Sequence, residues 1–130
     1  MRNPRYLLDT NIIIAALNGE ASVLDRLQRG HESFLSVITI GELLRGALGS
    51  QRVSGNVAKV QALAARMAVL PCELETAEHY ARIKHYLRSK GRPLPDNDVW
   101  IAATAEQREL VLVTRDVHFS HIETLTSERW

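Results

Sequence analysis

The chain has 130 residues, of which 45% are hydrophobic and 24% charged, which suits one folded domain over residues 1–130 and excludes a disordered chain. Its 16 basic and 15 acidic side chains give a formal net charge of +1, so binding to nucleic acid would require local basic patches. The single cysteine, Cys72, excludes an internal disulfide framework and a cysteine zinc cluster.

Short apolar runs alternate with helical patterns along the chain. In chain order, the first half predicts a strand at residues 6–8, helices at 12–17 and 20–29, and a second strand at 34–37. The next helix is expected to begin at Thr39 as its N-cap, because Glu42 stands three residues later, as in a capping box. The second half predicts a helix at 51–67, a strand at 67–70, a helix at 76–89 and a strand at 110–113.

The stretch LPDNDVWIAATA at residues 94–105 opens one more helix, after Gly91, Pro93 and Pro95 have broken the chain. This helix leads into the aliphatic run at 110–113, which is typical of a buried parallel strand. Strands that alternate with helices predict an α/β fold, a three-layer sandwich whose central, mostly parallel sheet is flanked by helices.

The N-terminal stretch places basic residues before apolar ones, as a secretion signal does. Asp9, Thr10 and Asn11 interrupt the apolar run, however, which argues against such a signal. No segment approaches the ~20 consecutive apolar residues that a membrane helix needs. A cytoplasmic location without a membrane partner is therefore expected.

Acidic side chains stand where the predicted strands end. Asp9 follows the first strand, Glu42 lies just beyond the second, and Asp116 follows the last. Asp98 begins the helix that runs into the last strand. Ligands of open α/β sheets bind beyond the carboxyl ends of the strands, so these four carboxylates are expected to converge on one cleft.

Four carboxylates in one cleft repel one another unless a cation offsets their charge. A set of oxygen ligands without Cys or clustered His suits Mg²⁺ or Mn²⁺. Such a cation orients a water molecule, lowers its pKa and stabilises the charge that develops during phosphodiester cleavage. Asn11 and Thr114 are suited to hydrogen-bonding a carboxylate or a phosphate, although turn roles fit their positions equally well.

Each acid also has a structural interpretation. Asp9 is a favourable N-cap, Glu42 could complete a capping box, and Asp116 could form a turn. One of Asp96 and Asp98 is expected to cap the helix that they begin. The joint placement of the acids, more than any one of them, favours a metal site.

Four ordered motifs cover essentially the whole chain: LLDTNIIIAAL at 7–17, LSVITIGELLRG at 35–46, LPDNDVWIAATA at 94–105 and LVLVTRDVHF at 110–119. In order and spacing they resemble the PIN-domain ribonucleases, and most of all the VapC toxins of bacterial toxin–antitoxin pairs. The resemblance implies a PIN-like fold with a Mg²⁺- or Mn²⁺-dependent endoribonuclease site.

The family's acids match four residues of this chain as catalytic groups: Asp9, Glu42, Asp98 and Asp116. The resemblance makes Asp9 and Asp98 the metal ligands, because the family's third acid falls on Asp98. It leaves Asp96 in a supporting role, together with Asn11 and Thr114. Relatives are usually dimers held inactive by a small antitoxin, and many cut transfer or ribosomal RNA. The resemblance therefore implies an RNA substrate, a VapB-like antitoxin, a homodimer and a larger toxin–antitoxin complex.

Two stretches contain basic but no acidic residues, one between Glu42 and Glu73 and the other between His79 and Pro95. They could follow a phosphate backbone beside the acidic cleft, although ordinary solvated helix faces explain them equally well. The candidate RNA-binding residues are Arg45, Arg88, Lys90, Arg92 and Arg115.

Two other functions stay open at this point. A non-catalytic PIN scaffold could bind RNA or protein, but it would have no need of all four acids. A phosphoacceptor receiver domain has a similar length and a parallel sheet. It would need adjacent acids after the first strand and a Lys after the last, where this chain has Asp9-Thr10-Asn11 and Thr114-Arg115-Asp116.

Overall fold

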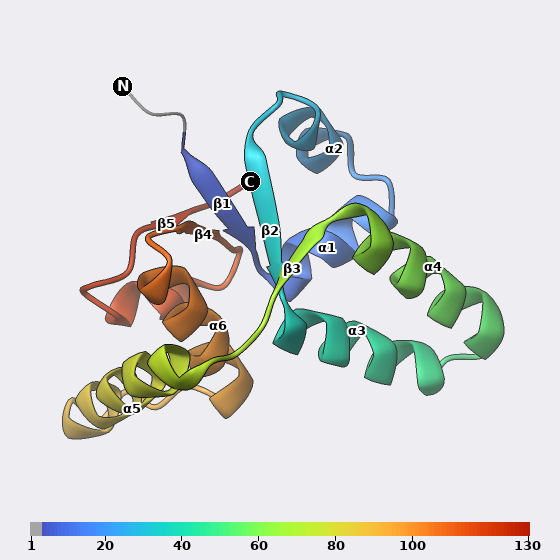
Figure 1. Cartoon of the computed structure of the whole chain (residues 1–130). Helices are drawn as coiled ribbons and strands as arrows, with labels where there is room; N and C mark the ends of the chain where they lie inside the picture. The colour runs from blue at the N-terminus through green and yellow to red at the C-terminus, as the bar shows by residue number, and fades with distance from the viewer. Residues whose placement is uncertain (1–3) are drawn as a thin grey trace.

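The structure, a computed structural model, describes residues 4–130, which form a five-stranded sheet flanked by helices (Figure 1). The strands are β1 (Arg5–Leu8), β2 (Glu32–Ser36), β3 (Ala68–Leu70), β4 (Val111–Val113) and β5 (Ser127–Glu128). The helices are α1 (Thr10–Leu17), α2 (Ala21–Leu27), α3 (Val37–Leu48), α4 (Val53–Arg66), α5 (Leu74–Ser89), α6 (Asp96–Gln107) and the 3₁₀ helix η1 (Val117–His121). The predicted α/β architecture is confirmed.

The strands lie in the order β3-β2-β1-β4-β5, and each neighbouring pair is parallel. The chain moves outward from β1 to β3, returns through α5 and α6 to the other side of β1, and then adds β4 and β5. The direction of strand addition thus reverses between β1 and β4. In such sheets the ligand crevice lies outside the carboxyl ends of the strands at this reversal, where Asp9 and Thr114 stand.

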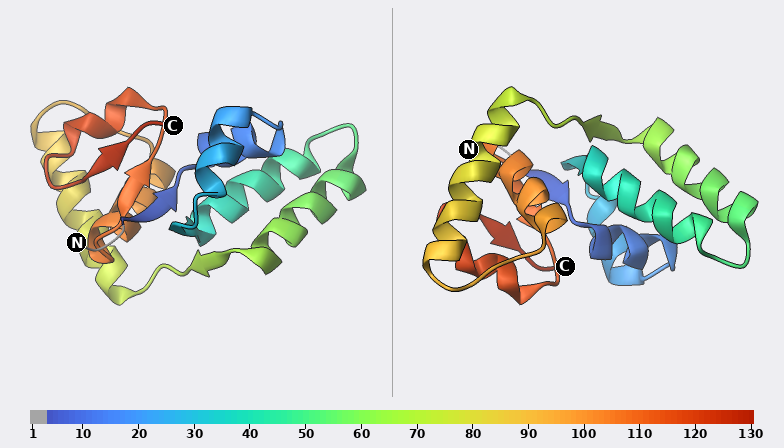
Figure 2. Two further views of the ribbon diagram at one scale, coloured as in Figure 1. Left: turned by 90° about the horizontal axis from the view of Figure 1, so that it is seen from above. Right: turned by 90° about the horizontal axis from the view of Figure 1, so that it is seen from below.

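Alternating side chains of the central strands supply two separate cores. Leu7 and Leu112 pack with α5 and α6, whereas Tyr6, Leu8 and Val113 pack with the helices between β1 and β3. All five side chains are buried. The two groups of helices consequently lie on opposite sides of the sheet and complete the three predicted layers (Figure 2).

Helix α6 is buried on nearly every side between the sheet and α5. Six of its residues have no exposed surface: Val99, Ile101, Ala102, Ala103, Thr104 and Ala105. Small alanines let the helix pack closely against its neighbours, as close-packed protein interiors require. Asp98 directly precedes the buried part of this helix, which begins at Val99.

Most element boundaries differ from the prediction by one or two residues, and the difference at the end of the second strand changes the predicted role of a residue. The second strand ends at Ser36 instead of residue 37, because the Ser36 hydroxyl accepts a hydrogen bond from the Ile38 N–H at 3.0 Å and caps α3. The prediction that Thr39 is the N-cap is therefore wrong, and Thr39 lies buried in the first turn. Strand β5 was not predicted, because a pair of residues carries no hydrophobic pattern. Within residues 4–130, no helix is both long and apolar enough to cross a membrane.

Candidate active site

Asp9 lies directly after β1 and is 4% exposed. Its Oδ1 accepts a hydrogen bond from the Thr10 N–H at 2.8 Å, and its Oδ2 accepts one from the Thr114 hydroxyl at 2.7 Å. Burial raises the pKa of Asp9, the bonds from Thr114 and Thr10 counteract part of this effect, and the charges of Glu42 and Asp116 add to it. Asp9 therefore caps α1, as its structural interpretation predicted, and also lies among other acids.

Glu42 reaches the same region from α3. Its Oε1 accepts a hydrogen bond from the Thr10 hydroxyl at 2.7 Å, and that hydroxyl lies 3.2 Å from the Thr39 hydroxyl. The capping-box interpretation of Glu42 is wrong, because Ser36 begins the helix three residues earlier than predicted. Glu42 thus lies in the second turn, where it is far from the helix start and faces α1 instead.

Asp98 occupies the third position of α6 and is partly exposed. Burial raises its pKa from 3.8 to about 6, and the charges of Asp9, Asp116 and Glu42 add to this effect, in that order. Among residues 4–130, no hydrogen-bond donor stabilises its ionised form. A carboxyl group in these surroundings favours a proton or a cation.

Asp96, two residues earlier, has quite different surroundings. Its Oδ1 accepts hydrogen bonds from the Tyr80 hydroxyl at 2.9 Å and from Lys84 Nζ at 2.7 Å, on the exposed side of α5. These two bonds, that of Lys84 first, hold the pKa of Asp96 below its usual value. The prediction that Asp96 or Asp98 caps α6 is wrong, because the N-cap position belongs to Pro95, which makes no side-chain cap bond.

The Thr114–Asp116 loop carries the fourth acid. The Thr114 hydroxyl, besides donating to Asp9, accepts hydrogen bonds from the Asp116 N–H at 3.0 Å and from Asn11 Nδ2 at 3.5 Å. The Asn11 amide oxygen accepts a bond from the Arg115 N–H at 3.3 Å. Asn11 and Thr114, which were predicted to support the site, therefore join this loop to the start of α1.

Asp116 caps η1 through a hydrogen bond from the His118 N–H at 2.9 Å, which confirms its predicted turn role. Its Oδ1 also lies 2.7 Å from His118 Nδ1. Burial acts to raise the pKa of Asp116, but the backbone bond, the ring bond and the charge of His118 outweigh it and hold the pKa below its usual value.

The structure brings the four predicted acids together, since each of Asp9, Glu42 and Asp116 perturbs the pKa of Asp98. They come from four segments that lie far apart in the sequence. Over residues 4–130, no three acidic, His or Cys side chains already stand as close together as a complete metal-ligand set does. Within residues 4–130 the four acids therefore share one region without forming a complete ligand set by themselves.

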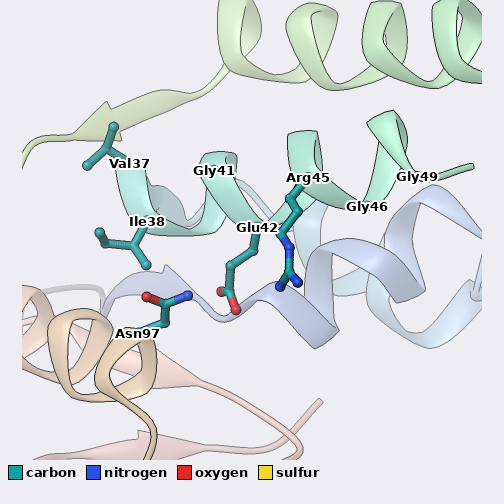
Figure 3. Close-up of a pocket in the computed structure, with 8 residues that line it drawn as sticks. All are labelled: Val37, Ile38, Gly41, Glu42, Arg45, Gly46, Gly49 and Asn97. Carbon is teal, nitrogen blue, oxygen red and sulfur yellow. The ribbon is translucent and has the colours of Figure 1, made fainter.

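A cavity of about 780 Å³ opens beside Glu42 along α3 (Figure 3). Figure 3 shows Glu42 and Arg45 extending from the same side of α3, with Asn97 of α6 across from Glu42. Gly41 and Gly46 leave the helix surface without bulky side chains at this cavity. Asn97 and the Glu42 partner Thr10 were not predicted as site residues. Their only signal in the sequence is that each directly adjoins a predicted acid.

The other candidate RNA-binding residues lie in two places. Arg88, Lys90 and Arg92 are exposed at the end of α5, and Lys90 and Arg92 line a cavity of about 310 Å³ with His121 of η1. Arg115 instead forms an ion pair with Glu20. Among the five candidate RNA-binding residues, Arg45 is the one that lines the same cavity as Glu42.

Comparison with known proteins identifies the family. Residues 6–125 match the model of the PIN domain. The chain is 33% identical to "Ribonuclease VapC1" of Haemophilus influenzae strain R2866, over 96% of this chain and 97% of that protein. It is 33% identical to the "tRNA(fMet)-specific endonuclease VapC" of Shigella flexneri, over 97% of this chain and 98% of that protein.

Solved structures agree with this result. The DNA-bound VapBC structure from Salmonella typhimurium contains a chain that superposes with a TM-score of 0.91 and 32% identity, over 98% of each chain. The VapBC-1 structure from nontypeable Haemophilus influenzae gives a TM-score of 0.88 and 33% identity, over 96% of this chain and 97% of that one. The chain therefore belongs to the PIN-domain family, within its group of VapC ribonucleases.

Proposed function

We propose that this chain is a Mg²⁺- or Mn²⁺-dependent endoribonuclease and the toxin of a VapBC-type toxin–antitoxin pair. The observation that carries the proposal is the convergence of Asp9, Glu42, Asp98 and Asp116 at the carboxyl end of a parallel sheet. The names of its VapC relatives support the RNA-cleaving part of the proposal.

The residues present suit a hard divalent cation. Their donors are carboxylate oxygens, the ligands that Mg²⁺ and Mn²⁺ prefer. Burial and mutual repulsion raise the pKa values of Asp9 and Asp98, so positive charge beside them would be stabilising. We assign Asp9 and Asp98 as the metal ligands. When bound, the cation would polarise the scissile phosphate and promote ionisation of a water molecule.

The chain's own groups orient the acids. Thr114 fixes Asp9 Oδ2, and Thr10 fixes Glu42 Oε1, which leaves the second Glu42 oxygen to accept a proton from the attacking water. Preorganised groups of this kind lower the barrier because they need no rearrangement during the reaction.

We further propose that the basic residues Arg45, Arg88, Lys90 and Arg92 contact RNA phosphates around the cleft. Such local basic residues can attract RNA although the formal net charge of the whole chain is only +1. The name of the Shigella relative specifies a transfer RNA, which makes structured RNA, transfer RNA first and ribosomal RNA second, the substrate to test. Several neighbouring structures are VapBC complexes, which supports a small VapB-like antitoxin as partner. We also propose a toxin homodimer within the larger toxin–antitoxin assembly.

The test is cleavage of transfer and ribosomal RNA by the purified protein with Mg²⁺, with Mn²⁺ and with EDTA. Asp9→Ala and Asp98→Asn should lower kcat by about 100-fold or more, because each removes a ligand that acts at the reacting atoms. Asp96→Asn is the matched control, since it changes the same residue type in the same helical turn but lies against Tyr80 and Lys84. Its rate should stay within about twofold of wild type.

Cleavage by Asp98→Asn at the wild-type rate would show that the assigned site is wrong. A wild-type protein that binds RNA but cuts none with either metal would support the non-catalytic scaffold instead. The toxin role is tested by expression in cells with and without the adjacent small reading frame. Growth should stop only when that frame is missing, and normal growth in both cases would refute the role.

A further inference from the structure

Arg115 lies between Thr114 and Asp116 of the site, and its side chain is hydrogen-bonded to other residues of the same chain. Nη1 donates to Glu20 Oε1 at 3.2 Å, Nη2 donates to Glu20 Oε2, and Nε donates to a main-chain oxygen of Trp130 at 3.1 Å. Every nitrogen of the guanidinium is therefore engaged. Such a paired fork is geometrically specific, and breaking it to reach an RNA phosphate would cost these bonds.

The main chain of the same loop is fixed from both sides. The Thr114 N–H donates to the Glu128 carbonyl at 2.9 Å, and Arg129 Nη1 donates to the Arg115 carbonyl at 3.0 Å. On the opposite side, the Asn11 amide oxygen accepts the Arg115 N–H at 3.3 Å. The loop thus lies between α1 and residues 128–130.

Helix α1 is attached to this loop at both of its ends. At its start, Asp9 accepts a hydrogen bond from Thr114. Beyond its end, Gly19 adopts a φ of +77°, a conformation that favours glycine, and the next residue is Glu20, which pairs with Arg115. The two attachments fix the loop relative to β1, which Asp9 directly follows.

We propose that Arg115 is a positioning residue, which acts through Glu20 and residues 128–130 to hold Thr114 and Asp116 in place, and not an RNA-binding cation. This inference rests on the proposed ribonuclease activity. It gives Arg115 the role of a structural link between the α1–α2 turn and the site, in place of the phosphate binding that the sequence predicts. A misplacement of catalytic groups by about 1 Å can lower a rate by about 100-fold. Contacts that fix this loop can therefore have a large effect on the cleavage rate.

The experiment compares Glu20→Gln, Arg115→Gln and the double variant in steady-state cleavage of the RNA that wild type cuts. If the pair positions the loop, both single variants lower kcat by about tenfold and leave KM within about twofold, and the double variant is no slower than the slower single one. Arg115→Lys should recover part of the loss, because a lysine can still pair with Glu20. Arg29→Gln is the matched control, since Arg29, two residues beyond α2, forms an exposed ion pair with Asp25 of that helix at 2.8 Å.

RNA binding by Arg115 predicts a different pattern. Arg115→Gln would then raise KM, whereas Glu20→Gln would release the guanidinium and leave KM unchanged or lower it. That pattern would overturn the inference. So would wild-type kcat in both single variants.

Hydrogen exchange tests the positioning without any RNA. The amide hydrogens of Thr114, Arg115 and Asp116 are all hydrogen-bonded, so a peptide that spans them should exchange slowly in wild type. Glu20→Gln should accelerate exchange in this peptide, and Arg29→Gln should not. Unchanged exchange would refute the inference. A wild-type protein with no ribonuclease activity would refute the proposed function alone, because the exchange result would still stand.

Discussion

Asp98 offers a sharp test of the electrostatics of the site, because a partly buried carboxylate among other carboxylates should lower the stability of the metal-free protein. The perturbation is Asp98→Asn, which removes the charge and keeps the shape. Burial and three neighbouring carboxylates raise the pKa of Asp98 from 3.8 to about 6. The folded protein therefore binds this proton more tightly than the unfolded chain does, and the ionised form is destabilising.

A rise in a carboxyl pKa from 3.8 to about 6 corresponds to about 3 kcal/mol of free energy of unfolding. Asp98 is partly exposed, so solvent screens these charges and about half of this value should remain. Replacement by Asn also removes a favourable interaction between the carboxylate and the start of α6, which costs about 0.5 kcal/mol. The net expectation is a gain of about 1 kcal/mol at about pH 7.5, or about 3–5 °C in Tm.

The sign of the pH dependence follows from the raised pKa. The contribution of Asp98 to wild-type stability should fall as the pH increases from about 4 to about 6, because Asp98 binds its proton more tightly in the folded state than in the unfolded state over this range. Asp98→Asn should lack this decrease, so its advantage should disappear toward pH 4. The assay is thermal unfolding in EDTA, followed by circular dichroism, at several pH values. Asp96→Asn is the control, and it should show no gain, since Asp96 is exposed and paired with Lys84.

An Asp98→Asn protein that is no more stable than wild type near neutral pH would refute this reasoning. The same holds for a gain that is equal at pH 4 and at pH 7.5, because it would arise from something other than the charge. A gain of the same size in Asp96→Asn would show that any reduction of negative charge has this effect.

Three further predictions concern the site and the core. Excess Mg²⁺ should raise the Tm of wild type and not that of Asp98→Asn. A wild-type Tm that does not change when Mg²⁺ is added would argue against a metal site. Thr114→Val should lower the free energy of unfolding by about 1–3 kcal/mol in urea titrations, since it leaves buried Asp9 Oδ2 without its donor. Thr114→Ser should not. Phe119→Ala should cost about 3–5 kcal/mol, because Phe119 is 1% exposed in the core beside α6, and a loss below 1 kcal/mol would contradict that packing.

The alternation of strands and helices could be predicted from the sequence because buried strands and amphipathic helices differ in hydrophobic period. The shared location of Asp9, Glu42 and Asp116 then followed from the way parallel sheets direct all carboxyl ends to one edge. Local capping was harder to predict. Ser36 and Thr39 are both good caps, and only the end of β2 decides between them.

Contacts between distant residues left no local signal at all. The pairing of Arg115 with Glu20 joins residues 95 positions apart, so nothing in either neighbourhood distinguishes it from an exposed cation. Asp96 and Asp98 share a turn and a residue type, and they differ only in what α5 and the sheet place beside them. Their different surroundings emerge only from packing.

The hydrogen bond between Asp9 and Thr114 joins residues 105 positions apart, so the site cannot assemble until both residues have been synthesised. During translation, β1, β2 and β3 with their helices emerge first, and they contain Asp9 and Glu42 but neither Thr114 nor Asp116. Asp9 meets its partner only when β4 has been added beside β1. A ribosome-bound chain that ends before β4 can contain Asp9, Glu42 and Asp98 but not Asp116, and it has no assembled cleft, so the order of synthesis itself delays assembly of the site until β4 and Asp116 have been made.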